Sequence, residues 1–298
     1  MYPVLFKLTV FGGHIEIGSY RFFLILAATV GVGLAWLIAG RRGLPSRQTL
    51  ILLLAVAAAV PIGARLLHVA TNYGVYARDP GRLFALRATG FALYGGLLLA
   101  VVVGPLLCRL LKLDVWRLAD SAAPAMGLSM AVVRVGCFLD GCCAGVPSSL
   151  PWAVSFPNSG AADLVKQTGS LPILGGALRE IATKPAATHP VDIYELIASL
   201  AGVALVIFLL RRRAADGVAF IAFALWFSAF RLVNHPLRVP TADFTGPAWF
   251  YPALYIAAGA VSLAALITII RRPAAVRQRG TSQPIAELSV ALPEQARS

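Results

Sequence analysis

Charged residues are scarce in this sequence. Only 13% of its 298 residues are charged, whereas 58% are hydrophobic. Ordinary soluble domains carry about 25% charged residues. The 13 acidic residues are outnumbered by 26 Lys and Arg, which gives a net charge of +13. This composition excludes a soluble globular domain that spans most of the chain.

Cysteine is also scarce, and its four copies are too few for a disulfide scaffold. Cys108 lies in an apolar run, while Cys137, Cys142 and Cys143 are close together in one connecting segment. The first 19 residues lack both a basic n-region and a small-residue cleavage site. We therefore expect no removable signal peptide, and the first apolar run should act as an uncleaved anchor.

Long apolar runs are abundant instead. A membrane-spanning helix needs about 20 mostly apolar residues. Seven such runs occur, at approximately 20–40, 50–72, 90–111, 118–133, 191–210, 217–233 and 249–270. The fourth run is the shortest and weakest. The sequence therefore predicts an all-α integral membrane protein with about seven transmembrane helices, forming one membrane domain over residues 1–272.

The basic residues are unevenly distributed along the chain. Clusters of Lys and Arg follow the first, third, fifth and seventh runs, at 41–47, 109–117, 211–213 and 271–279. Such alternation follows the positive-inside rule and places the N-terminus outside and the C-terminus in the cytoplasm. It also accounts for the net charge without a nucleic-acid partner. Residues 134–190 would form a small extracytoplasmic head segment, and the polar residues 273–298 a disordered cytoplasmic tail.

Three arginines occupy the outer halves of predicted spans, where charge is costly. They are Arg65, Arg134 and Arg231, and the sequence shows no comparable set of acids beside them. Charges at membrane depth indicate function by default, although each arginine could instead reach the headgroups or form a structural ion pair. Forked guanidinium groups bind phosphate well. We therefore predict a phospholipid headgroup site on the outer side.

Residues 134–145 (RVGCFLDGCCAG) carry the fullest motif. They resemble the signature of the prolipoprotein diacylglyceryl transferase family, Arg-x-Gly-Asn-Phe-x-Asn-x-Glu-x-x-Gly. Residues 90–96 (GFALYGG) resemble the family's segment ending in His-Gly-Gly, and residues 63–65 (GAR) its Gly-Gly-Arg. His189-Pro190 with Tyr194-Glu195 matches its His-Pro-x-x-x-Tyr-Glu.

Two further matches complete the resemblance, which keeps its order along nearly the whole chain. Phe230-Arg231 followed by Arg238 matches the family's Phe-Arg with a second arginine seven residues later. Tyr20 opens the first span, where the family has a tyrosine.

The sequence departs from the family at several positions. Tyr94 stands where the family has histidine, and Cys137 and Asp140 replace the two signature asparagines. Cys142 replaces the signature glutamate, and His235 replaces a second glutamate. Pro236 follows His235 and disfavours helical geometry there, so we expect the face shared by Arg231, His235 and Arg238 to be interrupted.

The resemblance implies a reaction at the outer face of the bacterial inner membrane. A diacylglyceryl group would pass from phosphatidylglycerol to the lipobox cysteine thiol in the signal peptide of a lipoprotein precursor, with no cofactor and no metal. Carried over residue by residue, the catalytic candidates are Arg134, Arg231, Tyr94 and His235. The substrate-binding candidates are Arg65, Tyr20, Gly95, Gly96, Asp140, Gly145, His189, Tyr194, Glu195 and Arg238.

The attacking thiol needs help to ionise, since its unperturbed pKa is about 8.5. A tyrosine is a poor base at neutral pH, so Tyr94 would orient a substrate or donate a hydrogen bond. His235, His68 or the arginines themselves would then favour the thiolate. Alternatives for other candidates are helix packing by Gly95 and Gly96 and an interfacial anchor made by His189, Tyr194 and Glu195.

Two other functions fit the same pattern. One is a diverged lipid transferase with another acceptor, and the other is a non-catalytic protein that binds or transports lipid. The cysteine group also leaves alternatives open: a soft-metal site, a disulfide in the oxidising exterior, or simple packing.

Overall fold

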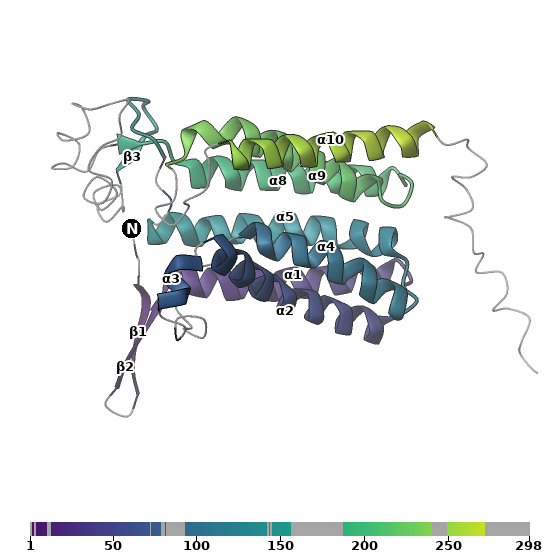
Figure 1. Ribbon diagram of the computed structural model, residues 1–298, viewed down its shortest axis with the longest axis horizontal. Coiled ribbons are helices and arrows are strands. Elements are labelled where there is room, and N and C mark those ends of the chain that lie inside the picture. The colour runs from purple at the N-terminus through teal and green to yellow at the C-terminus, as the bar shows by residue number, and fades with distance from the viewer. Residues whose placement is uncertain are drawn as a thin grey trace, which may run out of the picture.

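The computed structural model (Figure 1) describes residues 2, 4–10, 13–71, 73–78, 81, 93–141, 143, 145–155, 187–239 and 249–271. Seven long helices make up most of this described part: α1 (Ser19–Arg41), α2 (Ser46–Thr71), α4 (Leu93–Leu110), α5 (Val115–Asp140), α8 (Val191–Arg211), α9 (Val218–Asn234) and α10 (Phe250–Arg271). All but α4 are long and apolar enough to cross a membrane. The predicted all-α integral membrane architecture is confirmed. The expected tail at 273–298 lies outside the described residues.

Helix α5 is longer than the run at 118–133 suggested. It has 26 residues, because Asp114 caps its start by accepting a hydrogen bond from the Arg117 backbone N at 2.7 Å. Its end is closed by Gly141, whose φ of 75° suits glycine. Arg134 therefore lies within a spanning helix rather than at the start of the head segment.

The helices lie side by side along a common axis, with α5 between two groups (Figure 1). One group contains α1, α2 and α4, and the other contains α8, α9 and α10. Helix α5 packs against α1, α8 and α9. Small residues allow this close approach: a Cβ added at Gly127 of α5 would lie 2.6 Å from Cγ2 of Val203 in α8. This packing places the ends of α5, α8 and α9 next to one another.

The distribution of polar and apolar side chains is inverted relative to a soluble protein. Large apolar side chains face outward, including Ile25 at 68%, Val101 at 67% and Val261 at 70% exposure. Buried positions include Asp120, Glu195 and Asn234. An apolar exterior over a partly polar interior is what lipid surroundings require.

Short elements gather at one end of the bundle (Figure 1). They are the antiparallel hairpin β1 (Val4–Val10) and β2 (Gly13–Gly18), the helix α3 (Tyr73–Arg78), and the antiparallel pair β3 (Val154–Ser155) and β4 (Ala187–Thr188). The sequence did not lead us to expect these strands. A 3₁₀ turn, η2 (His235–Leu237), follows α9 at the same end.

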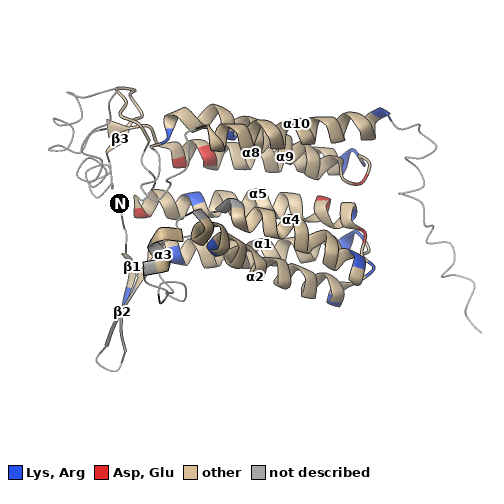
Figure 2. Ribbon diagram, viewed as in Figure 1, with Lys and Arg blue, Asp and Glu red and all other residues tan. Residues whose placement is uncertain are grey.

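Basic side chains gather at the opposite end (Figure 2). There Arg42 pairs with Asp216 at 2.6 Å, and Arg117 lies 3.5 Å from the same carboxylate. Buried Asp120 accepts hydrogen bonds from the backbone N of Gly217 and of Phe220, both at 2.8 Å. These contacts join the first turn of α9 to α5 and to the end of α1.

Candidate active site

Three arginines converge on the carboxylate of Glu195, which lies in α8 and is 2% exposed. Arg134 Nη2 from α5 lies 2.5 Å from Oε2. Arg238 Nη1, just after η2, lies 2.5 Å from Oε1, and Arg231 Nη1 from α9 bonds the same oxygen. Three segments that are distant in sequence, namely α5, α8 and the stretch from α9 to Arg238, therefore meet at one acidic side chain.

Further polar groups surround this pair of oxygens. Asn234 Nδ2 donates to Glu195 Oε1 at 3.1 Å, and Arg231 Nη2 donates to the Tyr255 hydroxyl at 3.0 Å. Arg134 Nη1 lies 3.4 Å from Oδ1 of Asp192, one turn before Glu195. The expectation that the arginines lack neighbouring acids was therefore wrong for Arg134 and Arg231. The acids come from another helix, which a local inspection of the sequence cannot associate with them.

The cluster retains a surplus of positive charge. Three guanidinium groups face two carboxylates, so their formal charges do not cancel. The arginine side chains of Arg134, Arg231 and Arg238 are 16%, 13% and 19% exposed. Glu195 and Asp192 hold the guanidinium groups in fixed positions, and the remaining charge and donors can bind an anion.

Pro236 does not keep Arg231 of α9 away from Arg238, which follows η2. His235 keeps helical dihedrals, with φ −57° and ψ −47°, so the expectation drawn from the proline was wrong at this residue. The α-helical face is nevertheless interrupted as expected, because α9 ends at Asn234, the chain tightens into a 3₁₀ turn, and Arg238 is extended. Arg231 and Arg238 consequently reach the same oxygen of Glu195. His235 itself packs against the Tyr255 ring, with centroids 6.0 Å apart.

Gly145 helps to place Arg238. The two residues form an antiparallel bridge, and the Val146 backbone N donates to the Leu237 carbonyl at 2.9 Å. A Cβ at Gly145 would lie 2.8 Å from Cβ of His189 and 2.9 Å from the Leu237 carbonyl oxygen. The structure thus gives Gly145 a positioning role, in addition to its predicted place near a substrate.

Gly95 and Gly96 are buried at the interface between α4 and α2. A Cβ at Gly96 would lie 2.6 Å from the Val60 carbonyl oxygen, and Gly95 lies directly against Gly63. This close contact is the helix packing that we had kept as the alternative to substrate contact. It also fixes the start of α4, where Tyr94 is the second residue; the Tyr94 side chain lies outside the described part of the structure.

Other predicted residues lie at the same end of the bundle. Arg65 lies over the Tyr76 ring, 5.6 Å from its centroid, and His68 Nδ1 is 2.9 Å from the Tyr76 hydroxyl. Trp152 Nε1 donates to the Tyr194 hydroxyl at 2.8 Å, and His189 Nδ1 is 3.3 Å from that oxygen.

The interfacial-anchor interpretation therefore fits His189 and Tyr194, whereas Glu195 is part of the arginine cluster. Tyr20 is the second residue of α1, and Asp140 is the last residue of α5. Both are partly buried.

Comparison with known proteins agrees with this geometry. A family model described as prolipoprotein diacylglyceryl transferase matches residues 3–274. The chain belongs to the prolipoprotein diacylglyceryl transferase family. The phosphatidylglycerol–prolipoprotein diacylglyceryl transferase of Geobacter sulfurreducens is 30% identical over 247 residues, which cover 81% of this chain and 84% of that relative. The protein of the same name from Bacillus cereus is 26% identical over 274 residues, covering 91% and 93%.

Three residues of this candidate site were missed by sequence reasoning: Asp192, Asn234 and Tyr255. Asp192 had a usable signal, because an acid in the first turn of a spanning helix is costly unless it has a partner. Asn234 directly precedes His235, so it could have been found as a polar residue at the end of a span. Tyr255 carried no local signal, since aromatic residues are common near helix ends in membranes.

Proposed function

We propose that the chain transfers a diacylglyceryl group from phosphatidylglycerol to the lipobox cysteine thiol of lipoprotein precursors. The observation that carries this proposal is the cluster of Arg134, Arg231 and Arg238 around Glu195, with its surplus positive charge. A phosphodiester is the anion that such forked donors suit. The similar proteins from Geobacter sulfurreducens and Bacillus cereus, named for this reaction, support the choice of substrates.

The protein must stabilise the departing phosphate and provide a destination for the thiol proton. The sulfur forms a bond to the terminal glycerol carbon of the diacylglyceryl group as the bond from that carbon to the phosphate oxygen breaks. Glycerol phosphate departs with the electron pair, and the thiol proton passes to a base or to water. Arg134 and Arg231 stabilise the charge on the departing phosphate, and Arg238 completes the cluster. Tyr94 and His235 remain the candidates for orienting a substrate or accepting the proton.

We further propose that the site faces the exterior of a bacterial inner membrane. The basic residues around Arg42 and Arg117 lie at the opposite end of the bundle (Figure 2) and would be cytoplasmic under the positive-inside rule. Reporter fusions after Gly40 and Leu210 should then report a cytoplasmic location, and a fusion near Ser159 an external one. A cytoplasmic signal from Ser159 would reverse the orientation.

Complementation tests the activity. The chain should restore growth and lipoprotein modification in a bacterium depleted of its own diacylglyceryl transferase. Arg134→Lys and Arg231→Lys keep charge but lose the forked donors, so each should reduce transfer about 10²-fold or more. Arg42→Lys is the matched control, because Arg42 makes similar ion pairs at the far end of the bundle. Growth restored equally by all three variants would overturn the arginine assignment.

A further inference from the structure

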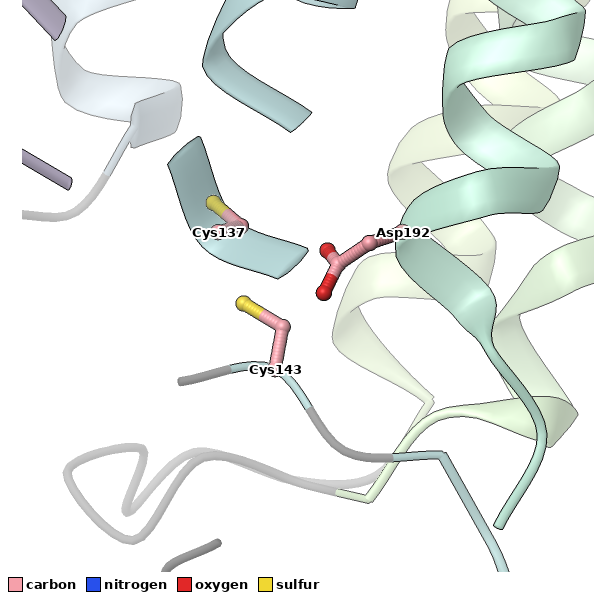
Figure 3. A group of neighbouring side chains, drawn as sticks. All are labelled: Cys137, Cys143 and Asp192. Atoms are coloured by element: carbon pink, nitrogen blue, oxygen red, sulfur yellow. The ribbon is translucent and has the colours of Figure 1, made fainter. Parts of the chain in front are cut away.

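Two cysteines and one aspartate form a group beside the arginine cluster. The Sγ atoms of Cys137 and Cys143 and a carboxylate oxygen of Asp192 all lie within 4.8 Å of one another. Figure 3 shows them gathered between the last turn of α5, the loop that follows it and the first turn of α8. Two of the three are deeply buried, with Cys137 2% and Asp192 0% exposed.

Asp192 is incompletely satisfied within this group. Its Oδ1 faces Arg134 Nη1 at 3.4 Å. Its Oδ2 is buried and has no hydrogen-bond partner among the described residues. A buried carboxylate oxygen without a donor is costly. Oδ2 is therefore the oxygen of Asp192 that remains available to a cationic ligand.

We propose that Cys137, Cys143 and Asp192 bind a thiophilic divalent cation, with Zn²⁺ as the best match. Thiolate and carboxylate are both zinc ligands, at about 2.3 Å and about 2.0–2.2 Å from the metal. Tetrahedral coordination at those lengths separates the ligand atoms by about 3.5–3.8 Å. The three ligand atoms lie within 4.8 Å of one another, so they need to approach by no more than about 1.3 Å to bind the metal.

The local charges balance when the cation is bound. Two thiolates and one carboxylate carry three negative charges, which a divalent cation and the Arg134 guanidinium together neutralise. Arg134 Nη1 lies 3.7 Å from Cys137 Sγ, so its charge is already in place. Arg134 would also orient Asp192 through Oδ1 while Oδ2 binds the metal. Carboxylates that bind metals are commonly held in this way by a second hydrogen-bond partner. This proposal departs from our expectation that no metal binds.

The three protein ligands leave a fourth position open, as in catalytic zinc sites. The next step rests on the proposed function: the fourth position takes the acceptor thiol of the lipobox cysteine. A thiol bound to the metal loses its proton to water. The metal-bound sulfur then attacks the terminal glycerol carbon of the diacylglyceryl group, forming the carbon–sulfur bond as the carbon–oxygen bond breaks and glycerol phosphate leaves toward the arginines. The metal thus supplies the thiolate that Tyr94 is poorly suited to generate.

Metal content is the first test. The full-length chain, purified from zinc-supplemented cells, should contain about one zinc per chain. Cys137→Ser, Cys143→Ser and Asp192→Asn should each reduce zinc to background. Cys108→Ser is the matched control, since Cys108 is a buried thiol in α4 and belongs to no part of the site. Because a variant could fail to fold, the parent protein is also stripped with a chelator and reloaded with Co²⁺.

Cobalt provides a readout that is independent of turnover. The reloaded parent should show a sulfur-to-cobalt charge-transfer band. A lipobox peptide with cysteine should change that band, and the same peptide with serine should not. No band, or a Cys137–Cys143 disulfide found in the protein purified without reductant, would overturn the metal site. A band that the cysteine peptide leaves unchanged would overturn the role of the fourth position.

Transfer assays separate this inference from the proposed function. Chelator-treated protein should lose transfer to the lipobox peptide and regain it with zinc. Full transfer by the metal-free protein would overturn the inference and leave the proposed function standing. The protein could bind zinc, lose it in each of the three ligand variants, and still show no transfer when loaded with zinc. That result would support the metal site and count against the proposed function.

Discussion

Glu195→Gln is the substitution that most directly tests the arginine cluster. Glutamine keeps the volume of the side chain but removes its charge and places an amide against the guanidinium donors of Arg134, Arg231 and Arg238. One pair of unit charges 4 Å apart is worth about 4 kcal/mol at an effective dielectric constant of 20, and much of this is offset by desolvation. Removing one partner of a buried ion pair typically costs about 3–5 kcal/mol.

The assay is thermal unfolding in detergent, followed by tryptophan fluorescence. At about 2–4 °C per kcal/mol for a chain of this size, Tm should fall by about 6–20 °C. If unbalanced positive charge is the cause, adding Arg238→Gln should restore about half of the loss, because it removes one of the repelling guanidinium groups. Asp120→Asn is a matched control: it should lower Tm, and Arg238→Gln should restore nothing there. A Glu195→Gln protein that melts within about 2 °C of the parent would refute the reasoning.

Three further substitutions test other residues that the sequence singled out. Gly145→Ala should reduce transfer more than stability, since its Cβ would lie against the Leu237 carbonyl oxygen and displace the segment that carries Arg238. Equal loss of Tm and rate would contradict this. Gly96→Ala should lower Tm by several degrees, about 1–3 kcal/mol of overpacking against α2, whereas Gly33→Ala, which meets open space, should not. Tyr94→Phe should lose only part of the rate if the hydroxyl merely orients a substrate. A 10²–10⁴-fold loss would instead indicate proton transfer.

The spanning helices were predictable because their signal is local. Each apolar run is close to the length that the bilayer demands, and the runs at 20–40 and 191–210 coincide closely with α1 and α8. The run at 118–133 was underestimated, because Arg117 and Arg134 lie at its two ends and α5 continues past both. The run also contains buried Asp120, which is held by tertiary partners such as the start of α9.

The partners of the arginines were not predictable in the same way. Arg134 in α5 and Glu195 in α8 are 61 positions apart in the sequence, with the head segment between them, so no local pattern pairs them. Their motifs were recognised separately, and only the packing of α8 against α5 joins them. The strand pair near Gly145 was equally inaccessible, because two-residue strands have no periodicity to detect.

Asp120 and Glu195, two buried carboxylates at opposite ends of the bundle, differ in a way that bears on function. Asp120 accepts two backbone N–H groups from the start of α9, so its position is fixed by the fold itself. The donors to the Glu195 carboxylate among the described residues are instead side chains, namely three arginines and Asn234. Side-chain donors can rotate toward another anion without unfolding a helix. An arriving phosphate can therefore share the guanidinium groups with Glu195, whereas the cluster around Asp120 is suited to a structural role alone.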